Sequence, residues 1–474
     1  MSTHRKYVSF PGRLVVLGFG AVGQGTLPLL LRHIDMKPEQ VTVITALPDA
    51  GQIARDLRVG FKVLRVTREN YLRVFDQHLG RGDFLFNASV DVGSLDAIEY
   101  CQQRGILYFD ACIEPWAGGH ENTSVSPGRR SNYAYREGAL ELRRKYPHGP
   151  AAMLTHGANP GLVSHLLKQA LLNLAADTGI AGSQPTSREQ WARLAQKLGV
   201  KVIHVAERDS QSSPRRKARD EFVNTWSSEA FAGESLQPAE LGWGTHERHW
   251  PHDAMEFGFG SGAAIYLNRP GASTCVRTWT PSEGPFIGFL ISHSEATTIP
   301  DYFTVRDATG RAVYRPTCHY AYHPCDDAVL SMLEFNGNNY HFPPRQRLLR
   351  DEITEGMDEL GVLLAGHAKN AYWYGSRLTI EQARRLCPYN NATSLQVNAP
   401  AMASVVWAMQ HPDAGILEPD ELPFREILDM SLPYLGEVVG AYTDWTPLTD
   451  RARLYPEDLD HEDPWQFKNI RVTG

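Results

Sequence analysis

The feature that most constrains the fold of this chain is a glycine-rich turn within the segment RLVVLGFGAVGQGT, residues 13–26. An apolar run, Leu14 to Leu17, leads directly into glycines with G-x-G-x-x-G spacing, and an apolar helical pattern follows. The first glycine permits a tight turn, the second lets the backbone approach a pyrophosphate, and the third lets helix and strand pack closely. The phosphates would lie on the helix N-terminus. The pattern therefore predicts a site for a nicotinamide dinucleotide, contacted by Gly18, Phe19, Gly20, Ala21, Val22 and Gly23.

Strand-like and helical patterns alternate through the first third of the chain. This alternation predicts an α/β fold, with a doubly wound parallel sheet of the Rossmann type. One helix is expected at Ser94 to Gln103, with Ser94 as its N-cap. Further strands are expected at residues 41–45, 61–66, 83–89, 106–111 and 151–154.

Ligands of such sheets bind beyond the carboxyl ends of the strands, and several polar residues follow the predicted strands. The first candidates for a site are Asp91, Asp110, Glu114 and Asn159. Of these, Asp91, Asp110 and Asn159, together with Ser89 at the end of the fourth strand, are predicted to contact the dinucleotide.

The second strand ends in Thr45, where an acidic residue would ordinarily bind the adenine ribose. Thr45 can hydrogen-bond a hydroxyl group, and no arginine stands beside it in the sequence to bind a 2′-phosphate. We therefore predict NAD, with Thr45 as one of its contacts.

The regular alternation is lost between residues 155 and 390, where aromatics, prolines and separate β-like runs are common. These runs fall at residues 201–206, 263–267, 286–292 and 302–305, after a helical connector at residues 164–175. We expect a second, α+β domain inserted after the sixth strand. The predicted division is a Rossmann domain at 1–158, a substrate and dimerisation domain at 159–390, a helical return at 391–425 and an extended C-terminal segment at 426–474.

Composition and charge exclude several classes of protein. A formal net charge of −7 disfavours a nucleic-acid partner and mildly favours a cationic ligand. No apolar run approaches the roughly 18 residues that span a bilayer, so we expect no membrane partner. Six scattered cysteines behind an N-terminus without a signal core predict free thiols in a reducing cytoplasm.

The second domain carries acidic residues close to a tryptophan at predicted strand ends. The string HVAERD contains Glu207, FVNTW contains Trp226 and FLISHSE contains His293. Carboxylates at two separations beside an aromatic face would bind an extended chain with a cation at each end, because cation–π and charge-assisted contacts both favour ammonium. Further carboxylates in this region are Glu234, Glu240, Asp326, Asp327 and Asp358.

Ten strings together resemble bacterial homospermidine synthase, over residues 13 to 470. They are GFGAVGQGTLPLL, NASVD, IEPW, GANPG, AERD, FVNTWS, LQPAELGWGTHE, RPTCHYAYHPC, GHAKNAYWYGS and AYTDWTPL. More distantly, the chain is similar to the saccharopine dehydrogenase-like enzymes, which share an interrupted Rossmann domain. The resemblance implies a homodimer that converts two putrescines, or spermidine and putrescine, into sym-homospermidine. It also implies that NAD is held as a prosthetic group and returned to its starting state.

The resemblance also implies a set of site residues. The family's pocket falls on Asp91, Glu114, Asn159, Glu207, Trp226, Glu234, His293 and Asp358, with Asp327 chosen from the adjacent aspartates of HPCDD. Departures from the family are Thr45 and His156, the latter where the family has cysteine.

The chemistry of amine oxidation suggests a role for each of these groups. An alkylammonium must lose a proton before hydride can leave its carbon, and its ordinary pKa is near 10.4. We expect Glu207 and His293 to position and deprotonate the reacting nitrogen, while Asn159 and Asp91 orient it. Trp226 would stabilise cationic intermediates, and two carboxylates, Glu234 and Asp358, would bind the distal ammonium.

Three other sequence features have simpler explanations. Cys318, His319, His323 and Cys325 match no standard zinc spacing, so we expect no metal. Lys369 is not needed as an imine-forming amine, because two free substrates suffice. His156 is expected to pack or hydrogen-bond rather than act as a base.

Two other functions remain open at this stage. A dehydrogenase of the saccharopine or carboxynorspermidine type would bind carboxylate substrates and would need arginines in the pocket. A non-catalytic NAD-binding polyamine sensor would bind the same ligands without turnover.

Overall fold

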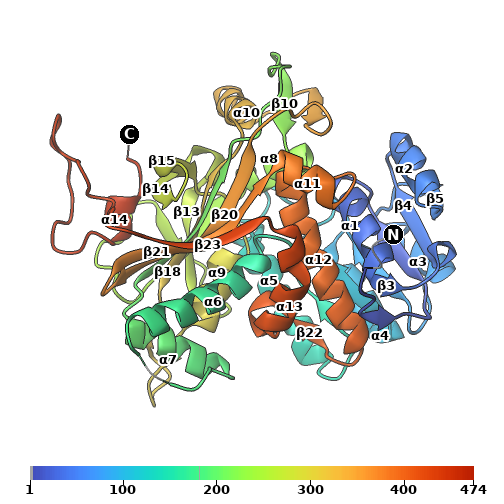
Figure 1. Ribbon diagram of the computed structural model, residues 1–474, viewed down its shortest axis with the longest axis horizontal. Coiled ribbons are helices and arrows are strands. Elements are labelled where there is room, and N and C mark those ends of the chain that lie inside the picture. The colour runs from blue at the N-terminus through green and yellow to red at the C-terminus, as the bar shows by residue number, and fades with distance from the viewer. Residues whose placement is uncertain (1–3, 181, 474) are drawn as a thin grey trace.

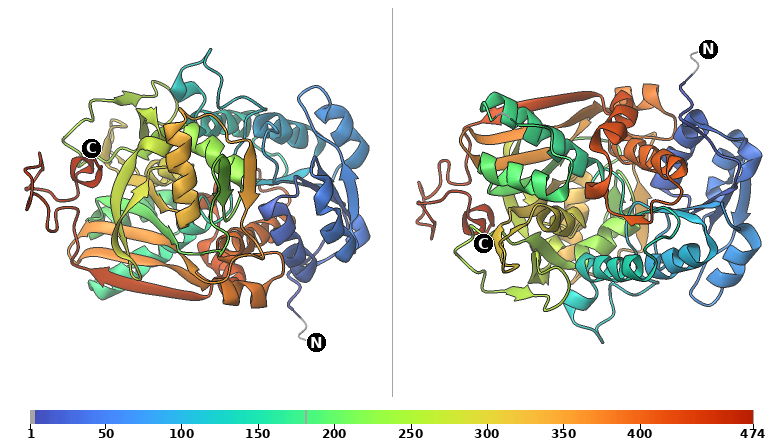
Figure 2. Two further views of the ribbon diagram at one scale, coloured as in Figure 1. Left: turned by 90° about the horizontal axis from the view of Figure 1, so that it is seen from above. Right: turned by 90° about the horizontal axis from the view of Figure 1, so that it is seen from below.

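The computed structural model describes residues 4–180 and 182–473, and these residues form two large sheets and three short strand pairs joined by helices and loops. The first sheet and its helices lie on one side of the molecule, and the larger mixed sheet forms the other (Figures 1 and 2). Within the described residues, every helix is too short or too polar to span a lipid bilayer.

The first sheet is parallel and has seven strands in the order β22-β8-β7-β6-β2-β4-β5. This arrangement confirms the predicted doubly wound sheet. Its strands are β2 (Leu14–Leu17), β4 (Val41–Thr45), β5 (Gly60–Val63), β6 (Phe84–Asn87), β7 (Leu107–Asp110), β8 (Ala152–Met153) and β22 (Ile416–Leu417).

Helices cover both faces of this sheet. Alternate residues of β2 point to opposite faces, so Leu14 and Val16 pack in one core while Val15 and Leu17 pack in another. Helices α1 (Ala21–His33) and α12 (Ala392–Gln410) contribute to the first core, and α3 (Tyr71–His78) and α4 (Ser94–Arg104) to the second. Two further helices of this part are α2 (Gly51–Asp56) and α5 (Asn132–Lys145).

The second sheet is mixed and has ten strands. Eight follow the order β12-β13-β11-β18-β9-β20-β21-β23, and the hairpin β14-β15 joins β18. These strands are β9 (Val202–Asp209), β11 (Pro238–Gly242), β12 (Ala254–Glu256), β13 (Ala264–Pro270), β14 (Cys275–Thr280), β15 (Gly284–Phe289), β18 (Thr317–His323), β20 (Met357–His367), β21 (Asn370–Thr379) and β23 (Glu437–Thr443).

The remaining elements surround the two large sheets. Three pairs of short strands are β1 (Val8–Ser9) with β3 (Ile34–Asp35), β10 (Glu221–Asn224) with β19 (Arg345–Leu348), and β16 (Val305–Arg306) with β17 (Ala312–Tyr314). The other helices are α6 (Leu162–Asp177), α7 (Arg188–Leu198), α8 (Ser228–Leu236), α9 (Glu295–Tyr302), α10 (Asp326–Gly337), α11 (Ile380–Leu386), α13 (Phe424–Ser431) and α14 (Phe467–Ile470).

The chain leaves the first sheet after β8, builds the second sheet and returns through α12, which confirms that the Rossmann fold is interrupted. The return goes further than the sequence pattern indicates, because β22 pairs with β8 and completes the edge of the first sheet. The C-terminal segment is likewise part of a sheet, since β23 pairs with β21 at the edge of the second sheet.

Two local predictions are wrong. Gly93, rather than Ser94, occupies the N-cap position of α4, while the Ser94 hydroxyl accepts a hydrogen bond from the Glu114 backbone N–H. Tyr302 ends helix α9, so the run at residues 302–305 is not one strand. A β-branched run marks apolar character, but periodicity over four residues cannot separate a helix end from a strand.

The packing of α1 on α12 gives a test of the fold. A Cβ at Gly25 would lie 2.1 Å from Asn398 Nδ2 and 2.4 Å from Asn390 Oδ1, so Gly25→Ala forces these side chains apart. We expect the free energy of unfolding to fall by about 1–3 kcal/mol in urea denaturation. Gly337→Ala is the control, because its Cβ meets no described atom within 4 Å. Equal stability of both variants would contradict the tight helix contact.

Candidate active site

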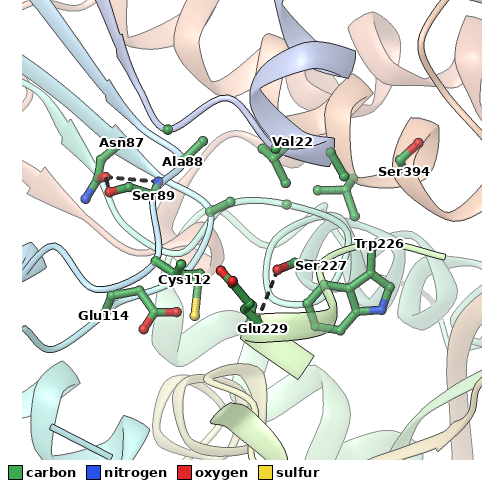
Figure 3. Close-up of a pocket in the computed structure, with 18 of the residues that line it drawn as sticks. Val22, Asn87, Ala88, Ser89, Cys112, Glu114, Trp226, Ser227, Glu229 and Ser394 are labelled. Carbon is green, nitrogen blue, oxygen red and sulfur yellow. Dashed lines mark hydrogen bonds between the residues drawn. The ribbon is translucent and has the colours of Figure 1, made fainter. Parts of the chain in front are cut away.

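A cavity of about 550 Å³ lies where the carboxyl ends of the first sheet face the second sheet. Figure 3 shows the glycine-rich segment on one side, with Val22 labelled, and the carboxylate of Glu114 and the indole of Trp226 below it. The fold therefore brings both groups of predicted residues to one cavity. Those in its lining are Gly18, Phe19, Gly20, Ala21, Val22, Thr45, Ser89, Asp91, Glu114, Asn159, Glu207, Trp226, Glu234, His293 and Asp358.

The glycine turn has the conformation that a dinucleotide site requires. Gly18 has φ of +83°, and a Cβ there would lie 2.5 Å from the Ala88 carbonyl oxygen. A Cβ at Gly20 would meet none of the described atoms within 4 Å, which leaves open space at the N-terminus of α1. Gly23 lies behind the turn and outside the lining, where a Cβ would be 2.6 Å from the Gly18 carbonyl oxygen. Backbone and helix dipole together suit a diphosphate.

The end of the cavity near Thr45 contains a residue that the sequence did not indicate. Thr45 pairs with Val63 on the neighbouring strand β5, and Arg65 follows that strand into the same lining. An arginine therefore lies near Thr45 in the folded chain, although none stands next to it in the sequence. Pairing of adjacent parallel strands is the signal that could have located it.

Besides Gly23, two predicted contacts lie outside the cavity lining. Asp110 is buried at the end of β7, where its Oδ1 accepts a hydrogen bond from the Thr155 N–H at 2.6 Å and its Oδ2 accepts one from the Tyr108 hydroxyl at 2.8 Å. Burial raises the pKa of Asp110 to about 7. Asp327 lies in the first turn of α10, 3.3 Å from Arg216. In both positions the carboxylate contacts neighbouring parts of the protein, which suits a structural role better than contact with a ligand.

Glu207 is the acidic centre of the cavity. Its Oε2 accepts hydrogen bonds from the Tyr320 hydroxyl at 2.5 Å and from Asn159 Nδ2 at 3.2 Å. Burial, the largest cause, raises the pKa of Glu207 to about 7, and the nearby charge of Asp209 adds to this effect. A carboxyl group with this pKa can both accept and release a proton near neutral pH.

Asp358 lies beside Glu207, and the charge of Glu207 acts on it. Its side chain is fully buried, and neither oxygen has a hydrogen-bond donor among the described residues. Burial, followed by the charges of Glu207 and Asp209, raises the pKa of Asp358 well above its ordinary value. Because an unpaired buried carboxylate is costly, this position favours a bound cation or a proton.

His293 lies between two carboxylates. Its Nε2 is 3.0 Å from Glu234 Oε2, its Nδ1 is 3.4 Å from Glu295 Oε1, and its ring stacks on Tyr320 at 4.4 Å between centroids. Burial lowers the pKa of His293, but the charges of Glu295 and Glu234 outweigh it and raise the pKa well above the ordinary value. An imidazolium cannot take a proton, so this geometry does not support the expectation that His293 deprotonates the amine. A role for His293 in positioning the amine is compatible with this geometry.

Trp226 follows strand β10, and its indole lines the cavity. Its Nε1 donates a hydrogen bond to the Tyr322 hydroxyl at 3.2 Å, and its ring packs against Phe231 at 5.5 Å between centroids. The polar edge of the indole is thus satisfied by protein, which fixes the orientation of the ring.

Acidic residues also surround the mouth of the cavity. Asp91, with a left-handed φ of +66°, and Glu114 line both this cavity and an adjoining one of about 350 Å³. Glu229 contributes an exposed carboxylate to both, and His120 Nε2 lies 3.3 Å from Glu114 Oε2. The approach to Glu207 is therefore negatively charged.

Sequence reasoning missed Tyr320 and Glu295, which hold Glu207 and His293. The string CHYAYH could have indicated the first, because Tyr320 and Tyr322 are two residues apart on β18 and share a face of the sheet. Glu295 offers no such signal, since its role depends on where helix α9 begins.

The three features given simpler explanations lie outside the cavity lining. His156 is buried, with its Nε2 2.9 Å from His165 Nε2. Lys369 Nζ lies 4.0 Å from the centroid of the Tyr442 ring. Among the described residues, no group of three or more His, Cys, Asp or Glu side chains is arranged to hold a metal ion.

The raised pKa of Glu207 predicts a pH-dependent stability. The folded state favours the protonated carboxyl, so the stability from this group is complete below the ordinary pKa of 4.5 and is lost as the pH rises through about 7. Glu207→Gln is neutral at every pH. We expect it to exceed wild type by about 1–3 kcal/mol in urea unfolding at pH 8 and to match it near pH 4.5.

The control for this prediction is Glu229→Gln, which removes an exposed carboxylate from the same cavity and should leave stability unchanged at both pH values. A Glu207→Gln variant no more stable than wild type at pH 8 would contradict the conclusion that the ionised Glu207 carboxylate destabilises the folded state.

The chain is similar over nearly its whole length to known proteins. The family model described as the saccharopine dehydrogenase NADP binding domain matches residues 14–153, and that of the saccharopine dehydrogenase C-terminal domain matches residues 157–443. The homospermidine synthase of Blastochloris viridis is 52% identical over 98% of both chains, and that of Mesorhizobium japonicum is 48% identical over 98% of this chain and 97% of its own. The crystal structure of the Legionella pneumophila homospermidine synthase in complex with NAD is 49% identical, covers 98% of each chain and superposes with a TM-score of 0.91. This chain therefore belongs to the homospermidine synthase family, within the saccharopine dehydrogenase-like enzymes.

Proposed function

We propose that this chain is an NAD-dependent homospermidine synthase that joins two putrescines, or spermidine and putrescine, into sym-homospermidine. The amine that leaves is ammonia, or diaminopropane when spermidine is the donor. The observation that carries the proposal is the shared cavity, in which the open turn at Gly20 faces the acidic centre of Glu207 and Asp358. The relatives that the chain resembles over 98% of its length support it.

The residues of the glycine turn fit NAD. The open space at Gly20 and the uncapped N-terminus of α1 suit the diphosphate, Thr45 suits a ribose hydroxyl, and Ser89 and Asn159 lie further along the same lining. When bound, NAD supplies a hydride acceptor that later returns the hydride.

Glu207 prepares the reacting amine. A putrescine ammonium keeps its proton in water, so the site must remove it before hydride can leave the adjacent carbon. Burial lowers the pKa of the amine, and the carboxylate of Glu207, with a pKa of about 7, accepts the proton. Asn159, bonded to the same carboxyl group, orients the nitrogen.

Trp226 and the carboxylates stabilise the positive charge that develops on the substrate. The indole face attracts a cation without offering a nucleophile that would trap the imine. The second amine then attacks the imine carbon, and Glu207 returns a proton to the nitrogen that departs. Glu114, Glu234, Asp91 and Asp358 supply the negative charge that holds the ammonium ends of both amines.

A dehydrogenase for carboxylate substrates is the first alternative. Two arginines line the cavity, Arg65 at the Thr45 end and Arg350, which donates a hydrogen bond to Gln24 of α1. The polar groups around Glu207 are Tyr320, Asn159, Asp358, Asp209 and His293. Neither arginine is among them, which favours a diamine over an amino acid. A non-catalytic polyamine sensor is the alternative of a different class.

Incubation of the purified protein with NAD and putrescine separates the three functions. A synthase forms homospermidine and ammonia without net NADH. A dehydrogenase accumulates NADH, and a sensor binds putrescine without forming product. Chromatography of the amines together with absorbance at the NADH band distinguishes these results.

The location and assembly of the protein are further parts of the proposal. A reducing cytoplasm is consistent with six unpaired cysteines, four of them buried. The homodimer comes from the family resemblance and is testable by light scattering.

The role of Trp226 predicts graded effects of substitution. Trp226→Ala removes the ring and should lower kcat roughly 100-fold, while Trp226→Phe keeps a smaller aromatic face and should retain part of the activity. The measurement is homospermidine formation at saturating putrescine. Equal losses in both variants would indicate that the indole only fills space.

The open space at Gly20 predicts a variant that folds without its cofactor. Gly20 has a negative φ of −83° and extended backbone, and a Cβ there would meet none of the described atoms within 4 Å, so Gly20→Val should match the wild-type Tm as apoprotein. Its side chain would occupy the space required by the diphosphate. We expect purified wild type to release bound NAD on denaturation and the variant to release none, as measured by chromatography. NAD bound at wild-type stoichiometry would contradict the placement of the diphosphate.

A further inference from the structure

A third buried carboxylate lies behind the two that face the cavity. Strands β9 and β20 are antiparallel, and their register pairs Asp209 with Asp358 and Glu207 with Leu360. Directly paired residues share a face of the sheet, as do residues two apart on one strand. Glu207, Asp209 and Asp358 therefore form one carboxylate cluster on a single face.

Asp209 differs from its two neighbours in how its charge is held. It is fully buried and outside the cavity lining, so substrate does not reach it. Its Oδ1 accepts hydrogen bonds from the backbone and side-chain nitrogens of Gln211 at 2.8 and 3.1 Å. Its Oδ2 accepts them from the hydroxyls of Thr225 and Thr393 at 2.7 and 3.1 Å.

Four donors of this kind stabilise a carboxylate, and none of the ion pairs formed by the described residues includes Asp209. Asp358 has no hydrogen-bond donor among the described residues. The arrangement is thus asymmetric, with a hydrogen-bonded carboxyl group in the second layer and two carboxyl groups with fewer donors in the first. Burial raises the pKa of Asp209 too, but its four donors oppose that rise and favour its ionised form over those of Glu207 and Asp358.

Other titratable groups surround the cluster. Tyr320 and Tyr322 face it from β18, Cys325 from the start of α10, and His293 from the loop before α9. Burial raises the pKa of Tyr322 and Cys325 far above neutrality, so both stay uncharged. His293 is already balanced by Glu234 and Glu295. Asp209 is then the fixed charge that most directly biases the pair in front of it.

We propose that Asp209 is a positioning residue that acts through Glu207 and Asp358, making this pair basic enough to take a proton from the reacting ammonium. The inference rests on the proposed synthase function and deepens its account of proton transfer. The nitrogen–hydrogen bond of the ammonium breaks, its electron pair stays on nitrogen, and the proton bonds to a carboxylate oxygen of the pair. The same proton later bonds to the departing amine, so the pair ends the cycle unchanged.

Asp209→Asn tests this role. The Asn carbonyl oxygen can still accept from Gln211, and its amide can donate to the two threonine hydroxyls, so the fold and Tm should be retained. Loss of the negative charge makes protonation of the pair harder. We expect the acid limb of the kcat profile to move about one to two pH units lower. We also expect the plateau kcat to fall roughly tenfold. KM for putrescine should change less than about twofold, because Asp209 does not line the cavity.

Thr225→Val is a second variant that does not depend on the stability of Asp209→Asn. It removes one of the donors that keep Asp209 ionised, and it lies outside the cavity lining. Because Asp209 then takes up a proton more easily and loses part of its charge, the acid limb should move in the same direction by a smaller amount. The matched control is Glu247→Gln, which neutralises another buried carboxylate, held by Thr317 and the Phe467 N–H, away from the cavity. Its profile should equal that of wild type.

The outcomes separate the two levels of the proposal. An active wild type whose acid limb is unmoved in folded Asp209→Asn and Thr225→Val would overturn the role of Asp209 alone. A wild type that forms no homospermidine from NAD and putrescine would overturn the proposed function.

Discussion

Negative charge buried without a matching cation is the constraint on which this site depends. Glu207 and Asp358 lie in the cavity wall, and Asp209 lies directly behind them, all with almost no access to water. Such a cluster is costly in an empty site, because burial penalises each ionised carboxylate. A diammonium substrate would relieve that cost, because its positive charges pair with the carboxylates and it can donate a proton to them. The same electrostatics can therefore both select a polyamine and begin its chemistry.

The fold builds this cluster from neighbouring strands and then places it opposite a dinucleotide turn. Antiparallel pairing of β9 with β20 sets the three carboxylates on one face, and the parallel neighbour β18 adds Tyr320. Helix α12 returns from the second sheet to pack on α1, where Asn398 contacts Thr26 and Gly25 leaves no room for a side chain. This contact holds the first sheet against the second, so the cofactor site and the acidic centre open into one cavity.

Several features could be predicted because they depend on neighbours in the sequence. The parallel sheet follows from alternating strands and helices, and the glycine turn follows from spacing. The protonation of His293 could not be predicted in this way, since it depends on Glu234 and Glu295 from other elements. Arg65 reaches the Thr45 end through strand pairing, and β22 joins the first sheet from more than 250 residues beyond β8. Long-range contacts of this kind leave little trace in local patterns.

The sequence by itself determined the Rossmann turn and the interrupted fold, because residue type and spacing are enough to specify them, and its family resemblance identified further residues that line the cavity. Only the tertiary structure decided that the pKa of Asp358 is raised by burial, that nearby carboxylates raise the pKa of His293, and that Asp327 lies outside the cavity lining. The physical reason is that a pKa depends on burial and on charges a few ångströms away. Those charges come from strands and helices that only folding brings together.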